Sequence, residues 1–166
     1  MKVICVTGMP GSGKSLVSKV ASEMGVKVFV MGDVVREEAL KRGIPINPEN
    51  LRALAMRLRE EEGADAVAKR VVAKVKRLGD GVVVIDGVRS LAEVECFKKH
   101  LGEVTLICVH ASPKTRFKRL LGRGRPDDPK SWEEFVKRDL MELKLGLGEV
   151  IALSDFMIVN EGSMED

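Results

Sequence analysis

Residues 3–16 read Val-Ile-Cys-Val-Thr-Gly-Met-Pro-Gly-Ser-Gly-Lys-Ser-Leu, a short apolar run followed at once by a glycine-rich segment. From Gly8 to Ser15 the segment satisfies the pattern G-x-x-x-x-G-K-[ST], and the residues after it are typical of a helix. A strand, a glycine turn and a helix in this order form the structural context in which the pattern binds phosphate groups. The sequence therefore predicts a phosphate-binding loop at residues 8–15.

Each residue type in this loop has a physical task. Glycines let successive backbone N–H groups turn toward the phosphates, and the following helix directs its positive end at them. Lys14 adds a charge at the outer phosphates, and the Ser15 hydroxyl is a ligand for Mg²⁺, so we expect ATP and Mg²⁺ as cofactors. The residues expected to contact the nucleotide are Gly8, Met9, Pro10, Gly11, Ser12, Gly13, Lys14, Ser15 and Leu16. The alternative is a glycine turn that only joins strand to helix, but every required residue and both flanking elements are present.

Length and composition set the broad class of the protein. The 166 residues fit one domain, residues 1–166. With 45% hydrophobic and 32% charged residues, no apolar run of membrane-spanning length and no leader-like start, we expect a soluble cytoplasmic protein without a membrane partner. A net charge of +3 is too small to indicate nucleic acid as a partner, and monomer and homo-oligomer are both compatible with the sequence.

Cys5, Cys96 and Cys108 lack metal-ligand spacing, and we expect buried thiols.

Apolar runs rich in branched residues alternate with helical stretches. Five candidate strands lie at residues 3–6, 26–30, 82–85, 104–109 and 156–159. Between the second and third, Val67, Val71, Val75 and Leu78 form a stripe with helical spacing. Strands that alternate with helices predict an α/β fold with a parallel, doubly wound sheet.

Capping residues mark four helix starts, and two segments interrupt the alternation. The predicted N-cap residues are Asn47, Ser90, Ser112 and Ser131. The first and third precede a proline, and the other two have a glutamate three residues later. The strand-poor residues 33–78 and the turn-rich residues 122–129 are predicted to be mobile additions to one sheet.

An acidic residue ends the third candidate strand. Asp86 follows the buried run at residues 82–85, and ligands bind at the carboxyl edge of an open parallel sheet. Asp86 is therefore the candidate to hold the water shell of Mg²⁺. A helix-capping aspartate is the alternative, but Ser90 is available for that task.

At this point the sequence resembles the adenylate kinase and nucleoside monophosphate kinase family. The resemblance spans nearly the whole chain and rests on residues 8–15, 32–36, 86–89 and 116–138. Gly32-Asp-Val-Val-Arg36 and Asp86-Gly-Val-Arg89 are similar to that family's G-D-x-x-R and D-G-x-x-R segments, whose arginines hold the acceptor phosphate. More narrowly, the chain resembles an archaeal group of adenylate kinase-related proteins, and it is also similar to dephospho-coenzyme A kinases.

The resemblance implies a P-loop NTPase three-layer fold with a five-stranded parallel sheet in the order 2-3-1-4-5. It also implies a helical acceptor-binding segment, placed at residues 32–63, and a short lid over the donor, placed at residues 122–130. In that family the loop after the last strand touches the donor base. Asn160 is accordingly assigned to nucleotide binding, and so is Arg119 of the arginine-bearing stretch 116–138.

Fixed cations are also what the chemistry requires, because a triphosphate brought against a second phosphate opposes many negative charges. Arg36 and Arg89 each follow a strand end and can offer forked donors to phosphate oxygens, with a surface ion pair as the alternative. Arg123, Arg125 and Arg138 are predicted to close over the site, although basic residues at helical spacing can also form a solvated face.

The function expected from these residues is that of an ATP-dependent nucleotide kinase, with AMP or another nucleoside monophosphate as acceptor. Asp33 separates this reading from the first alternative. With a monophosphate acceptor Asp33 orders magnesium-bound water, whereas with a hydroxyl acceptor such as dephospho-coenzyme A it is the catalytic base. The pairing of Arg36 with Arg89 favours the monophosphate. The second alternative is an ATP-binding switch that hydrolyses ATP slowly and engages a protein or RNA partner.

Overall fold

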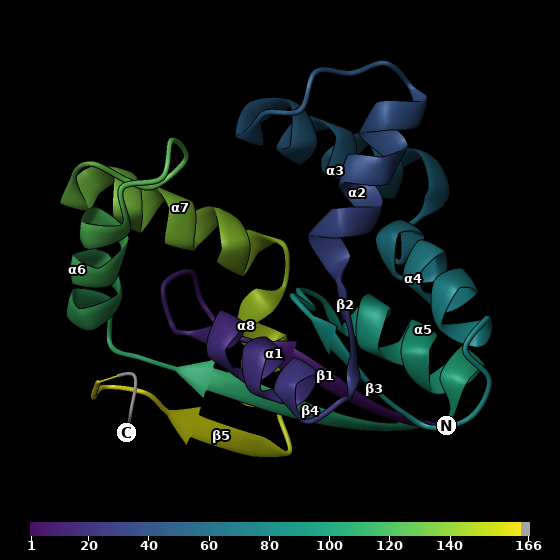
Figure 1. Cartoon of the computed structure of the whole chain (residues 1–166). Helices are drawn as coiled ribbons and strands as arrows, with labels where there is room; N and C mark the ends of the chain where they lie inside the picture. Colours follow the sequence, from purple (N-terminus) through teal and green to yellow (C-terminus); the bar gives the residue numbers. More distant parts are fainter. Residues whose placement is uncertain (164–166) are drawn as a thin grey trace.

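The computed structural model describes residues 1–163, which form a five-stranded parallel sheet and eight helices (Figure 1). The spatial strand order is β2-β3-β1-β4-β5, and every neighbouring pair is parallel. The expected sheet and its order are therefore confirmed. The strands are β1 (Lys2–Thr7), β2 (Lys27–Val30), β3 (Val82–Asp86), β4 (Glu103–His110) and β5 (Phe156–Val159).

Helices cover both faces of this sheet. One face is covered by α1 (Lys14–Glu23), and the other by α4 (Ala66–Lys76), α5 (Leu91–Leu101) and α8 (Leu147–Ala152). The remaining helices are α2 (Met31–Lys41), α3 (Pro48–Glu62), α6 (Pro113–Arg123) and α7 (Trp132–Lys144). The pair α2 and α3 and the pair α6 and α7 rise beyond the same end of the sheet, on opposite sides of it (Figure 1).

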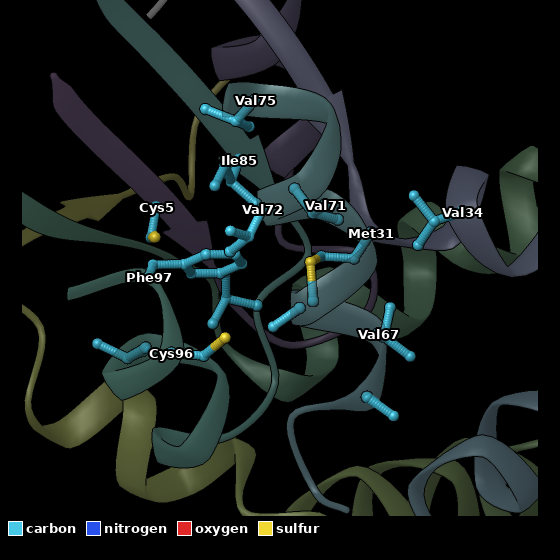
Figure 2. Close-up of a cluster of buried hydrophobic side chains, with 14 of the residues drawn as sticks. Cys5, Met31, Val34, Val67, Val71, Val72, Val75, Ile85, Cys96 and Phe97 are labelled. Atoms are coloured by element: carbon cyan, nitrogen blue, oxygen red, sulfur yellow. The ribbon is translucent and has the colours of Figure 1, made fainter. Parts of the chain in front are cut away.

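The main hydrophobic core lies between the sheet and α4 and α5. Figure 2 shows valines of α4 packed with Ile85 of β3 and Phe97 of α5. Val67, Val71 and Val75 are buried as the stripe predicts, but Leu78 is exposed because α4 ends at Lys76. The prediction that Leu78 belongs to the helical stripe was therefore wrong.

The three cysteines are buried and free, as expected. Burial raises the pKa of the Cys5 thiol to about 12, so this group stays protonated at neutral pH. The cysteines therefore fill core space and supply no nucleophile.

The helices between β2 and β3 are not loose additions to the sheet. Val34 of α2 and Leu54 and Leu58 of α3 belong to the same buried cluster as the α4 valines. The strand-poor residues 33–78 fold into three helices that share the main core, and their movement stays a prediction.

Three of the four predicted caps form. The side chains of Asn47, Ser90 and Ser131 accept hydrogen bonds from backbone N–H groups three residues later. The helix start predicted at Ser112 is confirmed, because Ser112 is the N-cap residue of α6 and a proline follows it, but its side chain makes no cap bond to the helix backbone. Glu161, which follows β5, accepts from the backbone N–H and the hydroxyl of Ser112 instead.

No helix among residues 1–163 is long and apolar enough to span a membrane.

Candidate functional site

The phosphate-binding loop leaves β1 after Thr7 and leads into α1 at Lys14. Gly13 is the N-cap of α1 with a φ of 100°, and a β-carbon at this position would collide with the side-chain amide of Asn160. No described side chain caps α1, and its first turn has no acidic residue. The first N–H groups of α1 and the positive end of its dipole are therefore directed at a potential anion site.

Lys14 folds back over this loop. Its Nζ donates to the carbonyl oxygen of Gly8 at 2.9 Å and to that of Met9 at 3.2 Å. Burial lowers the pKa of Lys14 to about 8, and the negative charge of Asp86 opposes part of the shift. The charges that act on the Lys14 ammonium belong to Asp86, Arg89, Glu142 and Arg138.

Asp86 stands at the carboxyl end of β3, beside β1 and β2. One of its oxygens accepts a 2.6 Å hydrogen bond from the Ser18 hydroxyl of α1, and Ser90 is the N-cap of α5. Asp86 therefore does not cap that helix. Residues 1–163 contain no group of three or more histidine, cysteine or acidic side chains that could hold a metal. Mg²⁺ needs only one or two protein oxygens besides water and phosphate, and Asp86 together with the exposed hydroxyl of Ser15 fits that requirement.

The two expected acceptor arginines sit in different surroundings. Arg36 lies on the first turns of α2 and forms a 2.5 Å ion pair with Asp33 one turn earlier, with both side chains half exposed. The backbone N–H of Arg89 donates to Glu93 at 3.0 Å, and its guanidinium lies 3.5 Å from a carboxylate oxygen of Glu142. Arg89 is therefore held at both its backbone and its side chain, whereas Arg36 pairs with a neighbour on its own helix.

Glu93 and Glu142 were not predicted as site residues. Glu93 is fully buried, and burial raises the pKa of its carboxyl despite the Arg59 guanidinium 3.6 Å away. One oxygen of Glu142 lies 3.5 Å from Arg89, and the other is buried without a hydrogen-bond partner among the described residues. A spacing of four residues from Arg138 places Glu142 on the same face of α7, and this was the signal in the sequence.

An aspartate organises the turn at residues 122–130. Asp128 is buried and accepts from the guanidinium of Arg123 at 2.5 and 2.8 Å and from the backbone N–H of Arg125 at 3.0 Å. Arg138 of α7 lies 3.7 Å from the same carboxylate and donates to the carbonyl oxygen of Asp127. The side chain of Arg125 is exposed. Of the three expected closing groups, Arg123 and Arg138 are thus engaged by Asp128, which was not predicted.

Arg119 and Asn160 support the phosphate-binding loop from outside. Arg119 of α6 donates to the carbonyl oxygens of Gly11 at 3.3 Å and Ser12 at 3.4 Å, and also to that of Asn160 at 2.6 Å. The side-chain amide of Asn160 donates to Ser12 at 2.9 Å. These bonds are made to carbonyl oxygens of the loop. They leave its backbone N–H groups available for an anion.

Arg116 is a buried member of the same basic run. It forms a bidentate ion pair with Asp139 of α7 at 2.7 and 3.0 Å, and its guanidinium also donates to the carbonyl oxygens of Pro10 and Ala111. It therefore ties the loop to α6 and α7. Its partner is 23 residues away, and no local pattern identifies such a pair.

The predicted residues fall into three groups. Lys14, Asp86, Arg89 and Arg138 interact electrostatically at the end of the sheet. Arg119 and Asn160 contact the loop, while Asp33 and Arg36 pair with each other on α2. Among the other residues expected to contact the nucleotide, Leu16 on α1 is half-buried and Ser15 is exposed.

Comparison with known proteins agrees with this geometry. A family model described as an AAA domain matches residues 7–136. A UPF0200 protein from Hyperthermus butylicus is 57% identical over 164 residues, which cover 99% of this chain and 88% of that protein. Among solved structures, TT1252 from Thermus thermophilus is similar with a TM-score of 0.66 at 22% identity, covering 98% of this chain and 90% of that one. Shikimate kinase from Bacteroides thetaiotaomicron is similar with a TM-score of 0.59 at 14% identity, covering 96% of this chain and 86% of that one.

The two solved structures share the fold of this chain. The family model spans well over half of the chain, and the relative matches almost all of it. The chain therefore belongs to the UPF0200 family of AAA-domain proteins, and its fold is that of a P-loop kinase.

Proposed function

We propose that this protein is an ATP-dependent kinase that transfers the γ-phosphoryl group to a small phosphate-bearing acceptor, with AMP or another nucleoside monophosphate as the first choice. The observation that carries the proposal is the set of charges around Lys14. Arg89, Arg138 and Asp86 act on its ammonium group beside the uncapped start of α1. A lone nucleotide-binding loop needs no such set, whereas two facing phosphates need cations on both sides.

The residues divide the work of an in-line transfer. The N–H groups at the start of α1 and the Lys14 ammonium bind the donor phosphates. Arg89 offers its guanidinium to the acceptor phosphate, and Glu93 fixes its backbone. Ser15 and Asp86 would hold Mg²⁺, which would supply neutralisation of the phosphate charges. A phosphate oxygen attacks as an anion, so no residue has to remove a proton in this version of the reaction.

Residues 32–63 and 122–130 are proposed as the acceptor-binding segment and the lid. Arg36 of α2 stands on the acceptor side, and Arg123, Arg125 and Arg138 stand on the lid side. Movement of the two segments toward each other would bring these arginines to the phosphates and exclude water from the transfer.

The direct test mixes the purified protein with Mg-ATP and each common nucleoside monophosphate in turn and follows the diphosphates formed. The proposal predicts diphosphate formation with at least one of them and none with Lys14→Ala. Tight ATP binding without transfer to any monophosphate would eliminate this version.

A hydroxyl-bearing acceptor is the second candidate. It is favoured by the carboxylates on the acceptor side, because a hydroxyl needs a base and Asp33 lies half exposed on α2. In that case Asp33→Asn nearly abolishes transfer while Arg89→Ala does not. With a phosphate acceptor Arg89→Ala is the more damaging of the two variants.

A further inference from the structure

The helix α7 is amphipathic, but it turns its polar face toward the protein and its apolar face outward. Its only buried residue is Phe135, and its other inward side chains are Arg138, Asp139 and Glu142. Asp139 pairs with Arg116, and Glu142 lies beside Arg89, so the polar face of α7 is turned toward the rest of the protein. A surface helix normally buries its apolar stripe, and here that stripe is on the outside.

The outward face of α7 carries an apolar stripe beside three charged residues, Glu133, Lys137 and Lys144. Trp132, Val136, Leu140 and Leu143 follow one another at helical spacing and are between 36% and 53% exposed. Trp132, Val136 and Leu140 border an open hollow of about 550 Å³, to which Met141 also contributes. Figure 1 shows α7 at the periphery, across the end of the sheet from α2 and α3. A contiguous apolar face of this kind marks a surface that another molecule covers.

The charges beside the stripe point to the identity of that molecule. Glu133 stands at the start of α7 and Lys144 at its end, and both line the hollow. They are 11 residues apart, close to three helical turns, so they lie on the same face. An antiparallel copy of the same helix places Glu133 against Lys144 of the second copy and repeats that pair by symmetry.

The apolar residues fit the same register. When Glu133 faces Lys144, Val136 faces Met141 of the second copy, and Trp132 faces Leu145, which is exposed just after the helix. Lys137, at the centre of the face, stands opposite Leu140 and can extend its ammonium to the rim. The surface is thus complementary to itself in charge and in the pairing of apolar side chains.

We propose that this protein forms a two-fold symmetric dimer through the outward face of α7, with Glu133 and Lys144 paired across the interface. One helix face per subunit is small beside specific, stable interfaces, which bury roughly 1,200–2,000 Å² in total. The dimer is therefore expected to dissociate on dilution. The proposal does not depend on the proposed kinase activity.

Sedimentation velocity of the full chain over a wide range of concentrations tests the proposal. The wild-type protein should pass from monomer to dimer as its concentration rises. Glu133→Lys and Lys144→Glu each create two like-charge contacts, and each should weaken dimerisation by roughly tenfold or more. An equimolar mixture of the two variants restores both opposite-charge pairs, and a heterodimer of near wild-type affinity should form.

The matched controls are Glu23→Lys on α1 and Lys99→Glu on α5, which make the same charge changes at exposed positions away from α7. They should dimerise as the wild type does, and circular dichroism should show all variants folded. A wild-type protein that stays monomeric at every concentration would overturn the proposal. So would single variants that dimerise normally, or a mixture that fails to associate, since the face would then serve another partner.

Discussion

Lys14 is a lysine whose protonation depends on what fills the phosphate-binding loop. In the ligand-free protein its pKa is lowered by burial to about 8, from an ordinary value of 10.5. Phosphate groups beside the ammonium favour its charged form and raise that pKa again. Binding of Mg-ATP near pH 8 is therefore predicted to take up protons, which calorimetry in buffers of different ionisation enthalpy measures directly.

The control for this prediction is Lys14→Arg, which keeps the charge but cannot lose its proton in this range. It should bind with no proton uptake at pH 8. The same lowered pKa implies that the free energy of unfolding of the ligand-free protein rises between about pH 8 and 10.5, because only the unfolded chain still holds the proton there. Zero uptake by the wild type at pH 8 would contradict the buried position of Lys14.

Arg89 is predicted to act on the acceptor and to leave ATP affinity nearly unchanged. Arg89→Ala removes a forked donor and should raise the KM for the monophosphate by roughly thirtyfold, equivalent to about 2 kcal/mol. Steady-state kinetics with the acceptor varied at saturating ATP gives this value. The matched control is Arg77→Ala at the exposed end of α4. Equal effects of the two substitutions would remove Arg89 from the site.

Single residues were predictable when their interaction partners lie close to them in the sequence. The loop residues were identified because motif, strand and helix are adjacent in the chain. Arg116 and Asp139 are 23 residues apart, and Glu142 meets Arg89 across a gap of 53, so their pairing depends on how the helices pack. Asp128 was missed although Arg123 is close in sequence, because an acidic residue in a turn is usually solvated.

At the level of elements, the turn between α6 and α7 depends on one buried carboxylate. Asp128→Asn removes the charge that binds Arg123 and Arg138 and is predicted to lower the free energy of unfolding at neutral pH by about 1–3 kcal/mol. Arg123 holds the pKa of Asp128 below its ordinary value of 3.8. The stabilisation is therefore present above that value and is lost as the pH falls through the lowered pKa.

Chemical denaturation at neutral and acidic pH measures this effect, and Asp127→Asn is its control. Arg138 donates to the backbone carbonyl oxygen of Asp127, and the substitution leaves this oxygen in place. Its substitution should change stability by less than about 0.5 kcal/mol. If the two variants were equally stable, Asp128 would not organise the turn.

All four predicted helix starts are observed, but the hydrogen bonds at one of them were not predictable from the sequence. Asn47, Ser90 and Ser131 cap their helices with their own side chains, which is a local event. The start of α6 instead receives Glu161 from beyond β5, 49 residues away from Ser112. There the Ser112 hydroxyl donates to the Glu161 carboxylate, which also accepts from the Thr115 hydroxyl.

At the level of the whole molecule, the proposed acceptor segment is part of the main core. Leu58 of α3 is fully buried in the cluster that contains the α4 valines. Leu58→Ala is predicted to lower the free energy of unfolding by about 2–5 kcal/mol in a single transition. Met56→Ala, on the exposed side of the same helix, should change it little. A separate early transition in the Leu58 variant would show that α3 unfolds independently of the sheet.

The global topology was the most predictable feature of the protein. Alternating apolar runs and helical stretches indicate a parallel sheet whatever the details of packing, and the resemblance supplied the strand order. The reversed polarity of α7 was not predicted. Periodicity reports that a helix has an apolar face but not which way it points, and the inward direction of Arg138 and Glu142 is decided by their partners on other elements.

Calorimetric titration of Mg-ATP into the wild-type protein and into Lys14→Ala tests the central claim most directly. We predict saturable binding to the wild type and at least roughly tenfold weaker binding to the variant, because the variant loses the cation that faces the outer phosphates. No heat of binding with any magnesium nucleoside triphosphate, or equal affinities for the two proteins, would contradict a polyphosphate site at the start of α1.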